Sequence, residues 1–219
     1  MNNPVSGSSR KMVLRFVLLC VGIFLLGLSG GCQQDSKPKE EKQTLVSLDN
    51  LQTAYGVSLK RAKMYELFLP QAAKEKFRGV AALYRALQRS ELIHSAVHAN
   101  LMKKHSIEPA PVKYDSVVVG STMQTLKMAV SSEELESSSM YPNLLRTATM
   151  ENFTEGIDQF AMIGAVEERH VELLKEAQNK MGKIDAKYLV CPGCGYIVTS
   201  DATEECPVCK NPKAKFEKI

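Results

Sequence analysis

Apolar residues recur at helical spacing in four long segments of the chain. With a period near 3.6 residues, such a pattern gathers apolar side chains on one side of each helix. It predicts helices over about Asp49–Lys76, Arg78–His105, Ser121–Met150 and Asn152–Met181. The break from 106 to 119 is long enough to cross a bundle, whereas the others are short. We therefore expect a mainly α, four-helix bundle.

Local signals mark the expected helix ends. Asp49 is a candidate cap for the first helix, because its side chain can accept a hydrogen bond from a free backbone N–H. Ser121, with Gln124 three residues later, forms the start of a capping box. Pro70 should kink the first helix, because proline removes one backbone hydrogen bond.

Acidic and histidine side chains share the apolar faces of the last three helices. They form three pairs spaced i, i+3, so the two side chains of a pair lie on the same side of their helix. The pairs are Glu91 with His94, Glu133 with Glu136, and Glu167 with His170. Four carboxylates and two imidazoles are therefore expected to converge inside the bundle.

Buried carboxylates at this density need compensating cations. Each ionised carboxylate removed from water costs several kcal/mol unless it is paired. Lysines and arginines lie mostly on other helix faces, so two divalent metals would supply the charge, and oxygen with imidazole nitrogen suits iron or manganese. The alternative is that the helices are rotated and the glutamates face solvent. We expect His98 and His105 behind the metal ligands or at the surface.

The C-terminal segment carries two Cys-x-x-Cys hooks. They are Cys191 with Cys194, and Cys206 with Cys209. Four thiolates at this spacing can wrap one tetrahedral zinc or iron ion. Disulfides are the alternative in an exported protein, but the short spacing in a module of about 34 residues with little core favours a metal.

The N-terminus has the features of an export signal. Basic residues precede an apolar run from Val13 to Leu28 and small residues before Cys32. The segment resembles a bacterial lipoprotein signal, although Ser29 stands where an aliphatic residue is preferred. Cys32 would then be lipidated and anchor the protein on the periplasmic side of the cell envelope. An uncleaved membrane anchor is the alternative.

Net charge adds little to this picture. The chain carries +4, but Arg10, Lys11 and Arg15 lie in the leader, so the rest is near neutral. This argues against nucleic acid as a partner. Residues 33–42 are polar and charged, without apolar periodicity, and are expected to form a flexible tether.

The motifs resemble those of the rubrerythrin family. The likeness is carried by Asn50–Tyr65, Val80–His94, Val119–Pro142 and Ala165–His170, and by a rubredoxin-like tail with the motifs CPGCGY and CPVC. It implies a ferritin-like di-iron bundle over 48–182 and a rubredoxin-like domain over 186–219. The export signal and the polar segment before them predict a leader over 1–31 and a tether over 32–47.

The resemblance also implies roles for individual residues. Glu91 and Glu167 match carboxylates that bridge two irons, and Tyr65 and Tyr141 match tyrosines close to the metals. The remaining expected ligands are His94, His170, Glu133 and Glu136. The four cysteines would hold a third iron, with zinc as the structural alternative.

One expected ligand is missing. Where rubrerythrins have a glutamate on the first helix, this chain has Ser58. Glu66 is eight residues further on, about 12 Å along the helix, and so lies at the wrong depth. Either Glu136 takes over that position and both metals are kept, or one metal position is weak or empty.

The resemblance implies reduction of hydrogen peroxide to water at the di-iron site, with electrons returned through the cysteine-bound iron. It also implies a homodimer or higher oligomer, and leaves the electron donor unknown. One alternative is a membrane-tethered electron-transfer or scaffold protein with a degenerate di-iron site. Another is iron oxidation or oxygen scavenging at the same site.

Overall fold

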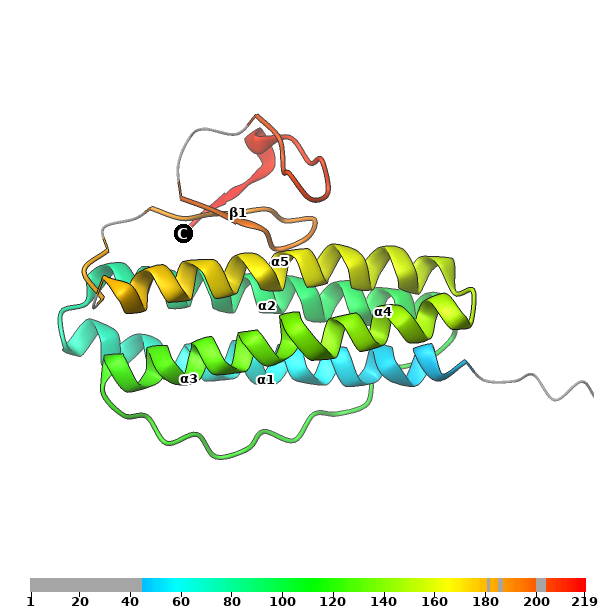
Figure 1. The fold of residues 1–219 in the computed structure, drawn as a ribbon, viewed down its shortest axis with the longest axis horizontal. Coiled ribbons are helices and arrows are strands. Elements are labelled where there is room, and N and C mark those ends of the chain that lie inside the picture. Colours follow the sequence, from blue (N-terminus) through cyan, green and yellow to red (C-terminus); the bar gives the residue numbers. More distant parts are fainter. Residues whose placement is uncertain (1–44, 181, 185–186, 200–203) are drawn as a thin grey trace, which may run out of the picture. The chain divides into compact units, whose positions relative to one another are not determined.

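The bundle is built from four long helical segments. The computed structural model describes residues 45–180, 182–184, 187–199 and 204–219. The helical elements are α1 (Val46–Lys74), α2 (Arg78–Lys104), α3 (Thr122–Leu135), the π-helix η1 (Glu136–Met140), α4 (Tyr141–Met150) and α5 (Thr154–Asn179). Because α3, η1 and α4 follow one another directly, they form one segment of the bundle (Figure 1). The predicted four-helix bundle is confirmed.

The expected leader and Cys32 lie outside the described residues. The last residues of the expected tether, Val46 and Ser47, belong to α1. No helix in the described part of the chain is long and apolar enough to cross a membrane.

The long connection between α2 and α3 runs beside α1 (Figure 1). Gln52 of α1 and the backbone of Ala110 form two hydrogen bonds, with Ala110 N 2.7 Å from Gln52 Oε1. Further along, Lys60 Nζ lies 2.9 Å from Asp115 Oδ2. The connection therefore crosses the bundle lengthwise, as its length predicts.

The predicted start of α1 is wrong by three residues. The helix begins at Val46, and Asp49 lies in its first turn instead of capping it. The carboxylate of Glu151 accepts hydrogen bonds from the backbone N–H groups of Val46 and Ser47, at 2.8 and 2.9 Å. The first N–H groups are thus satisfied from a distant helix end, which no local pattern reveals.

The third predicted helix begins as expected but is not α-helical throughout. Ser121 and Gln124 form the predicted capping box. The π-helical turn at Glu136–Met140 was not predicted, and it shifts the helix face. Tyr141 is buried after this turn, whereas the preceding Met140 is only partly buried.

The bundle core consists of two apolar clusters with a polar layer between them. Towards one end, Phe68, Leu87, Leu126 and Leu174 belong to one cluster. Towards the other end lie the residues of the second cluster, which include Leu51, Met102, Leu144, Phe160 and Ile163. Each helical segment contributes to both clusters, so its residues between them form a layer across the bundle.

The C-terminal module is a small antiparallel sheet. Its strands β1 (Leu189–Val190), β2 (Ile197–Val198) and β3 (Glu217–Lys218) lie in the order β2-β1-β3, with the 3₁₀-helix η2 (Lys213–Lys215) before β3. Its apolar residues Tyr188, Val190 and Ile197 join a bundle cluster. The module therefore packs on the bundle instead of forming an independent core.

Candidate metal centres

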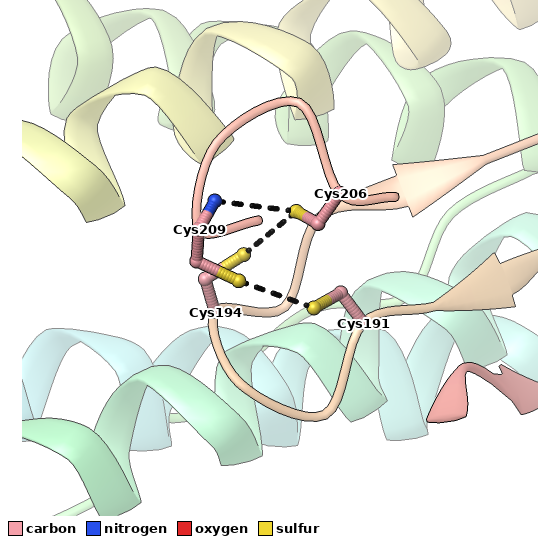
Figure 2. Close-up of side chains that lie close together, drawn as sticks. All are labelled: Cys191, Cys194, Cys206 and Cys209. Atoms are coloured by element: carbon pink, nitrogen blue, oxygen red, sulfur yellow. Dashed lines mark hydrogen bonds between the residues drawn. The ribbon is translucent and has the colours of Figure 1, made fainter. Parts of the chain in front are cut away.

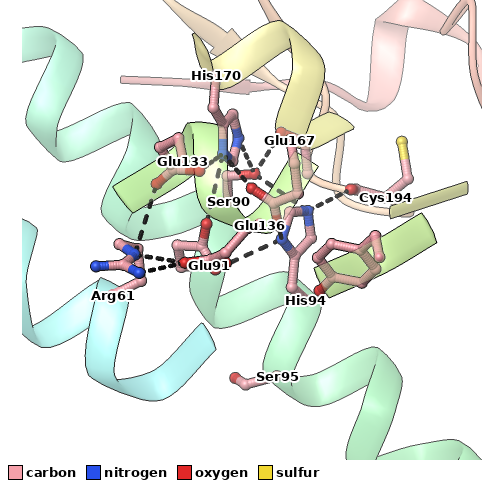
Figure 3. Close-up of polar contacts among 12 residues, drawn as sticks. Arg61, Ser90, Glu91, His94, Ser95, Glu133, Glu136, Glu167, His170 and Cys194 are labelled. Atoms are coloured by element: carbon pink, nitrogen blue, oxygen red, sulfur yellow. Dashed lines mark hydrogen bonds and ion pairs between the residues drawn. The ribbon is translucent and has the colours of Figure 1, made fainter. Parts of the chain in front are cut away.

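The acidic and histidine residues selected from the sequence meet in the polar layer. They are almost fully buried, and none of them is more than 2% exposed: Glu91, His94, Glu133, Glu136, Glu167 and His170. The arrangement with glutamates facing solvent is therefore not the one that the structure has. Figure 3 shows these side chains, contributed by α2, α3, η1 and α5, turned towards one another.

Two carboxylates each reach both histidines. Glu91 places Oε1 3.4 Å from His170 Nδ1 and Oε2 3.5 Å from His94 Nδ1. Glu167 places Oε1 2.9 Å from His94 Nδ1 and Oε2 3.0 Å from His170 Nδ1. Each carboxylate thus offers one oxygen to each side of the site, which is the geometry of a bridging ligand to two metals.

Both histidines present Nδ1 to the carboxylates and are held through Nε2. His94 Nε2 lies 3.0 Å from the carbonyl oxygen of Cys194, which can only accept a hydrogen bond, so Nε2 carries the proton. Ser90 Oγ donates to the carbonyl of Gly195 at 2.7 Å and so accepts from His170 Nε2 at 2.9 Å. Fixing the outer nitrogen in this way leaves the Nδ1 lone pair free for a metal.

The site contains buried polar atoms with unused bonding capacity. Both oxygens of Glu91 have no hydrogen-bond partner within the described part of the chain, and Glu167 Oε1 and His94 Nδ1 have none besides their 2.9 Å contact with each other. Orphaned buried carboxylate oxygens are costly unless a cation completes them. Oxygen and imidazole donors suit iron, and the ligand atoms of Glu91, Glu133, Glu167 and His170 lie within 4.8 Å of one another. The residues therefore fit a metal centre.

Without a cation, protons have to compensate the charge. Burial, together with the neighbouring Glu167, raises the pKa of Glu133 to about 8. Burial lowers the pKa of His94, but the charges of Glu167 and Glu91 outweigh it and raise this pKa to about 10. These protons sit on the groups that a metal would use, so metal binding must displace them.

Two tyrosines contact this layer. Tyr65 donates a short hydrogen bond to Glu133, and Tyr141 Oη lies 3.1 Å from His98 Nε2. Burial raises the pKa of both phenols well above the usual value, so both remain protonated. His98 is buried behind the site, whereas His105 is partly exposed and pairs with Glu155 at 2.8 Å.

Arg61 is a site residue that the sequence analysis missed. It extends from α1 and pairs with Glu136, and its Nε lies 3.9 Å from Glu133 Oε1. The sequence spacing could have indicated that Arg61 faces the interior. Ser58, Arg61 and Tyr65 lie at i, i+3 and i+7 and therefore share one face of the helix. Ser58, where the resemblance leads us to expect a ligand, is fully buried.

The second candidate centre is the cysteine cluster of the module (Figure 2). Cys191 Sγ lies 3.5 Å from Cys209 Sγ, and Cys194 Sγ lies 3.5 Å from Cys206 Sγ. A disulfide would need about 2.05 Å, and all four cysteines are free. Four sulfurs within 4.8 Å of one another match the edges of a tetrahedron with metal–sulfur bonds of about 2.3 Å.

Thiol ionisation also favours a cation at the cysteine cluster. A hydrogen bond with Cys194 is the main reason why the pKa of Cys191 falls to about 4. Burial, the largest cause, raises the pKa of Cys209 to about 11. The Cys191 thiolate forms readily, whereas the pKa values of Cys194 and Cys209 are raised, so a metal is needed to hold these thiols as thiolates.

The two centres are joined by direct contacts. Besides the hydrogen bonds to Cys194 and Gly195 described above, Arg89 of α2 forms two hydrogen bonds of 2.6 Å with Glu217 of β3. Gly195 has a φ of +82°, and a Cβ there would lie 2.4 Å from Ser90 Oγ. Glycine therefore allows the cysteine loop to approach the histidines closely.

Comparisons with known proteins agree with this arrangement. Residues 49–178 match the rubrerythrin family model, and residues 190–217 match the model of the rubrerythrin rubredoxin-like domain. The chain is 30% identical over 179 residues to rubrerythrin-2 of Clostridium acetobutylicum, covering 78% of this chain and 96% of the relative. It is 31% identical over 189 residues to a putative rubrerythrin of Methanocaldococcus jannaschii, covering 78% and 91%.

Solved structures show the same architecture. Fully reduced, all-ferrous nigerythrin superposes with a TM-score of 0.73 at 28% identity, covering 83% of this chain and 91% of nigerythrin. A bacterioferritin from Desulfovibrio desulfuricans superposes with a TM-score of 0.59 at 16% identity, covering 64% and 81%. The second likeness shows the ferritin-like fold alone.

Proposed function

The chain belongs to the rubrerythrin family, and from this premise we propose that it reduces hydrogen peroxide to water at the paired-metal site of its bundle. Family membership gives it a di-iron site and a rubredoxin-like cysteine site. The proposal rests on the positions of Glu91 and Glu167. Each carboxylate points one oxygen towards His94 and the other towards His170. Such a pair of bridging carboxylates suits two metals that act together.

The reaction consumes two electrons and two protons, breaks the oxygen–oxygen bond of peroxide and releases two waters. Two irons held in reduced form at this site would supply the electrons, and an iron held by the four cysteines would return them one at a time. The residues of this chain would hold the metals, exclude bulk water and donate the protons.

Tyr141 is placed to donate a proton, and His98 orients its hydroxyl group. The side-chain nitrogen of Gln159, an amide donor, lies 2.7 Å from His98 Nδ1. Nδ1 therefore accepts, and the proton on Nε2 is donated to the Tyr141 oxygen. Burial lowers the pKa of His98 to about 3, so the ring stays neutral. The phenolic hydrogen of Tyr141 is then free to be donated to another acceptor.

This chain of hydrogen bonds ends at a surface pocket. Gln159 lines a cavity of about 510 Å³ between α2 and α5, together with Val97, Lys104 and Met162. Water in this pocket reaches the outer end of the hydrogen-bond chain, where the Gln159 amide fixes the tautomer of His98 and so directs the His98 Nε2–H at Tyr141. His98 acts through Tyr141 and is therefore a positioning residue.

The contact between module and bundle supports the electron route. The carbonyl of Cys194, a cysteine of the sulfur cluster, accepts a hydrogen bond from His94 at 3.0 Å. A covalent path through one residue and one hydrogen bond thus joins the two candidate centres within one chain.

Peroxide-dependent oxidation of the reduced protein tests the proposal. The iron-loaded chain is reduced without oxygen and mixed with hydrogen peroxide or with dioxygen, while the oxidation of the cysteine-bound iron is followed by its visible absorption. Rapid oxidation by peroxide and slow oxidation by dioxygen supports peroxide reduction. Faster oxidation by dioxygen favours oxygen scavenging or iron oxidation, and no oxidation by either favours the electron-transfer or scaffold alternative.

We also propose that a lipid on Cys32 anchors the protein on the periplasmic side of the envelope, and that the protein forms a homodimer. The anchor is supported by the apolar run before Cys32. Mass spectrometry of the mature protein, showing a diacylglycerol-modified Cys32 at the N-terminus, tests it.

A further inference from the structure

Arg61 places a permanent positive charge inside the carboxylate layer. Its Nε donates to Glu136 Oε1 at 2.7 Å, and Nη2 donates a second, shorter hydrogen bond to the same oxygen. The Arg61 side chain is 17% exposed and that of Glu136 only 2%. Figure 3 shows the guanidinium directed from α1 towards Glu136 and Glu133. A fork of this kind holds a carboxylate in a fixed position.

The ligand atoms are unequally distributed between the two histidines. Around His170 Nδ1 lie Glu133 Oε2 at 3.3 Å and one oxygen each of Glu91 and Glu167. Around His94 Nδ1 lie the other oxygens of Glu91 and Glu167. The position beside His170 thus has a carboxylate of its own, whereas the position beside His94 has only the two shared ones.

Two residues explain the shortage beside His94. Ser58 stands where the family has a glutamate on the first helix, and its hydroxyl carries no charge. Glu136, the remaining candidate, has one oxygen held by Arg61 and the other buried without a hydrogen-bond partner in the described chain. Glu136 also lies outside the group of four residues whose ligand atoms converge within 4.8 Å.

The charge balance also predicts that the second metal binds more weakly than the first. Four ionised glutamates together with the guanidinium carry about three negative charges, and two divalent ions bring about four positive ones. The first ion lowers the excess of negative charge. The second must approach a layer that already contains one metal and Arg61, so it gains less and is opposed by the guanidinium.

We propose that Arg61 acts as a resident cation that makes the two metal positions of the bundle unequal. The position formed by Glu133, His170, Glu91 and Glu167 binds first and tightly. The position beside His94 binds more weakly, because Ser58 supplies no ligand and Arg61 retains Glu136. This inference rests on the paired-metal site of the proposed function, but not on peroxide as its substrate.

An anaerobic titration of the full-length, metal-free chain with Co²⁺ tests the proposal. Cobalt bound by thiolates has charge-transfer absorption, which separates the module from oxygen- and nitrogen-bound cobalt in the bundle. We expect two bundle steps whose affinities differ by at least about tenfold, equivalent to about 1.4 kcal/mol. Replacing Arg61→Met should strengthen the second step by at least about tenfold, because Glu136 becomes available.

Lys60→Met is the matched control, since Lys60 is the neighbouring cation of α1 but pairs with Asp115 outside the layer. It should leave both bundle steps unchanged. Two bundle steps of equal affinity in the unchanged chain, or an unaltered second step in Arg61→Met, would overturn the proposal.

Ser58→Glu keeps the test decisive if Arg61→Met does not fold. A glutamate at this position supplies the missing ligand and should strengthen the second step while leaving the first unchanged. If the second step does not change, the proposal is refuted. A chain with two equal steps could still reduce peroxide, so the titration and the peroxide assay can fail separately.

Discussion

Replacing Gly195→Ala tests whether the cysteine module is held on the bundle through the histidine layer. Gly195 has a φ of +82°, and an added Cβ would lie 2.4 Å from Ser90 Oγ and 2.8 Å from His94 Nε2. The left-handed backbone costs an alanine about 1–2 kcal/mol. Relieving the clash separates the loop from α2 and breaks the hydrogen bonds of Ser90 and His94 to the module.

The expected loss of stability follows from these contacts. Each of the two hydrogen bonds contributes about 1 kcal/mol, so the total loss is about 3–4 kcal/mol. For a chain of this size, each kcal/mol corresponds to roughly 2–4 °C in melting temperature. Calorimetry of the iron-loaded protein should therefore show the melting temperature lowered by roughly 10 °C.

Gly56→Ala is the matched control, because a Cβ there meets only Val112 Cγ2, at 3.8 Å. It should melt at least as high as the unchanged protein, since alanine favours a helix over glycine. Hydrogen exchange of α2 amides around Ser90 should rise in Gly195→Ala alone. Equal melting temperatures and equal exchange in the two variants would refute the inferred docking.

Three further predictions concern the metals and protons. Affinity for the first bundle metal should rise at least about tenfold per pH unit between about pH 6 and 8. Binding displaces protons from Glu133, with a pKa of about 8, and from His170, whose pKa is lowered by burial but raised overall above its usual value by the charge of Glu167. A pH-independent Co²⁺ affinity would contradict this. Cys191→Ser should abolish the visible thiolate–iron absorption and leave the bundle iron in place, as elemental analysis can check; loss of both would show that the centres do not load separately. His98→Leu should slow peroxide-dependent oxidation about tenfold without changing iron content, because Tyr141 loses the hydrogen-bond donor that orients it; an unchanged rate would exclude a role for His98 in positioning Tyr141.

Periodicity predicted the helices and the layer, but not the contacts that bring distant segments together. The i, i+3 pairs lie on the buried stripe, so Glu91, His94 and their counterparts could be found without coordinates. The start of α1 could not be found, because Glu151 caps it from a distance of 104 residues along the chain. The π-helical turn after Leu135 was likewise not predicted, because the helical periodicity that we read does not distinguish it from an α-helical turn.

Arg61 shows a different limit of the sequence. A single arginine near the edge of an apolar stripe is usually solvated, and only its approach to Glu136 shows that the layer contains a cation of its own. The sequence alone led us to expect that Ser58 replaces a glutamate ligand. Its consequence depends on where Glu136 points, which is a property of the folded chain.

The iron content of the full-length protein, loaded anaerobically with excess ferrous iron, tests the central claim most directly. Buried carboxylates that need cations predict about three irons per chain, two in the bundle and one bound by cysteines. Mössbauer spectra should separate the oxygen- and nitrogen-bound irons from the thiolate-bound one. A single metal per chain, held by the cysteines alone, would contradict the account.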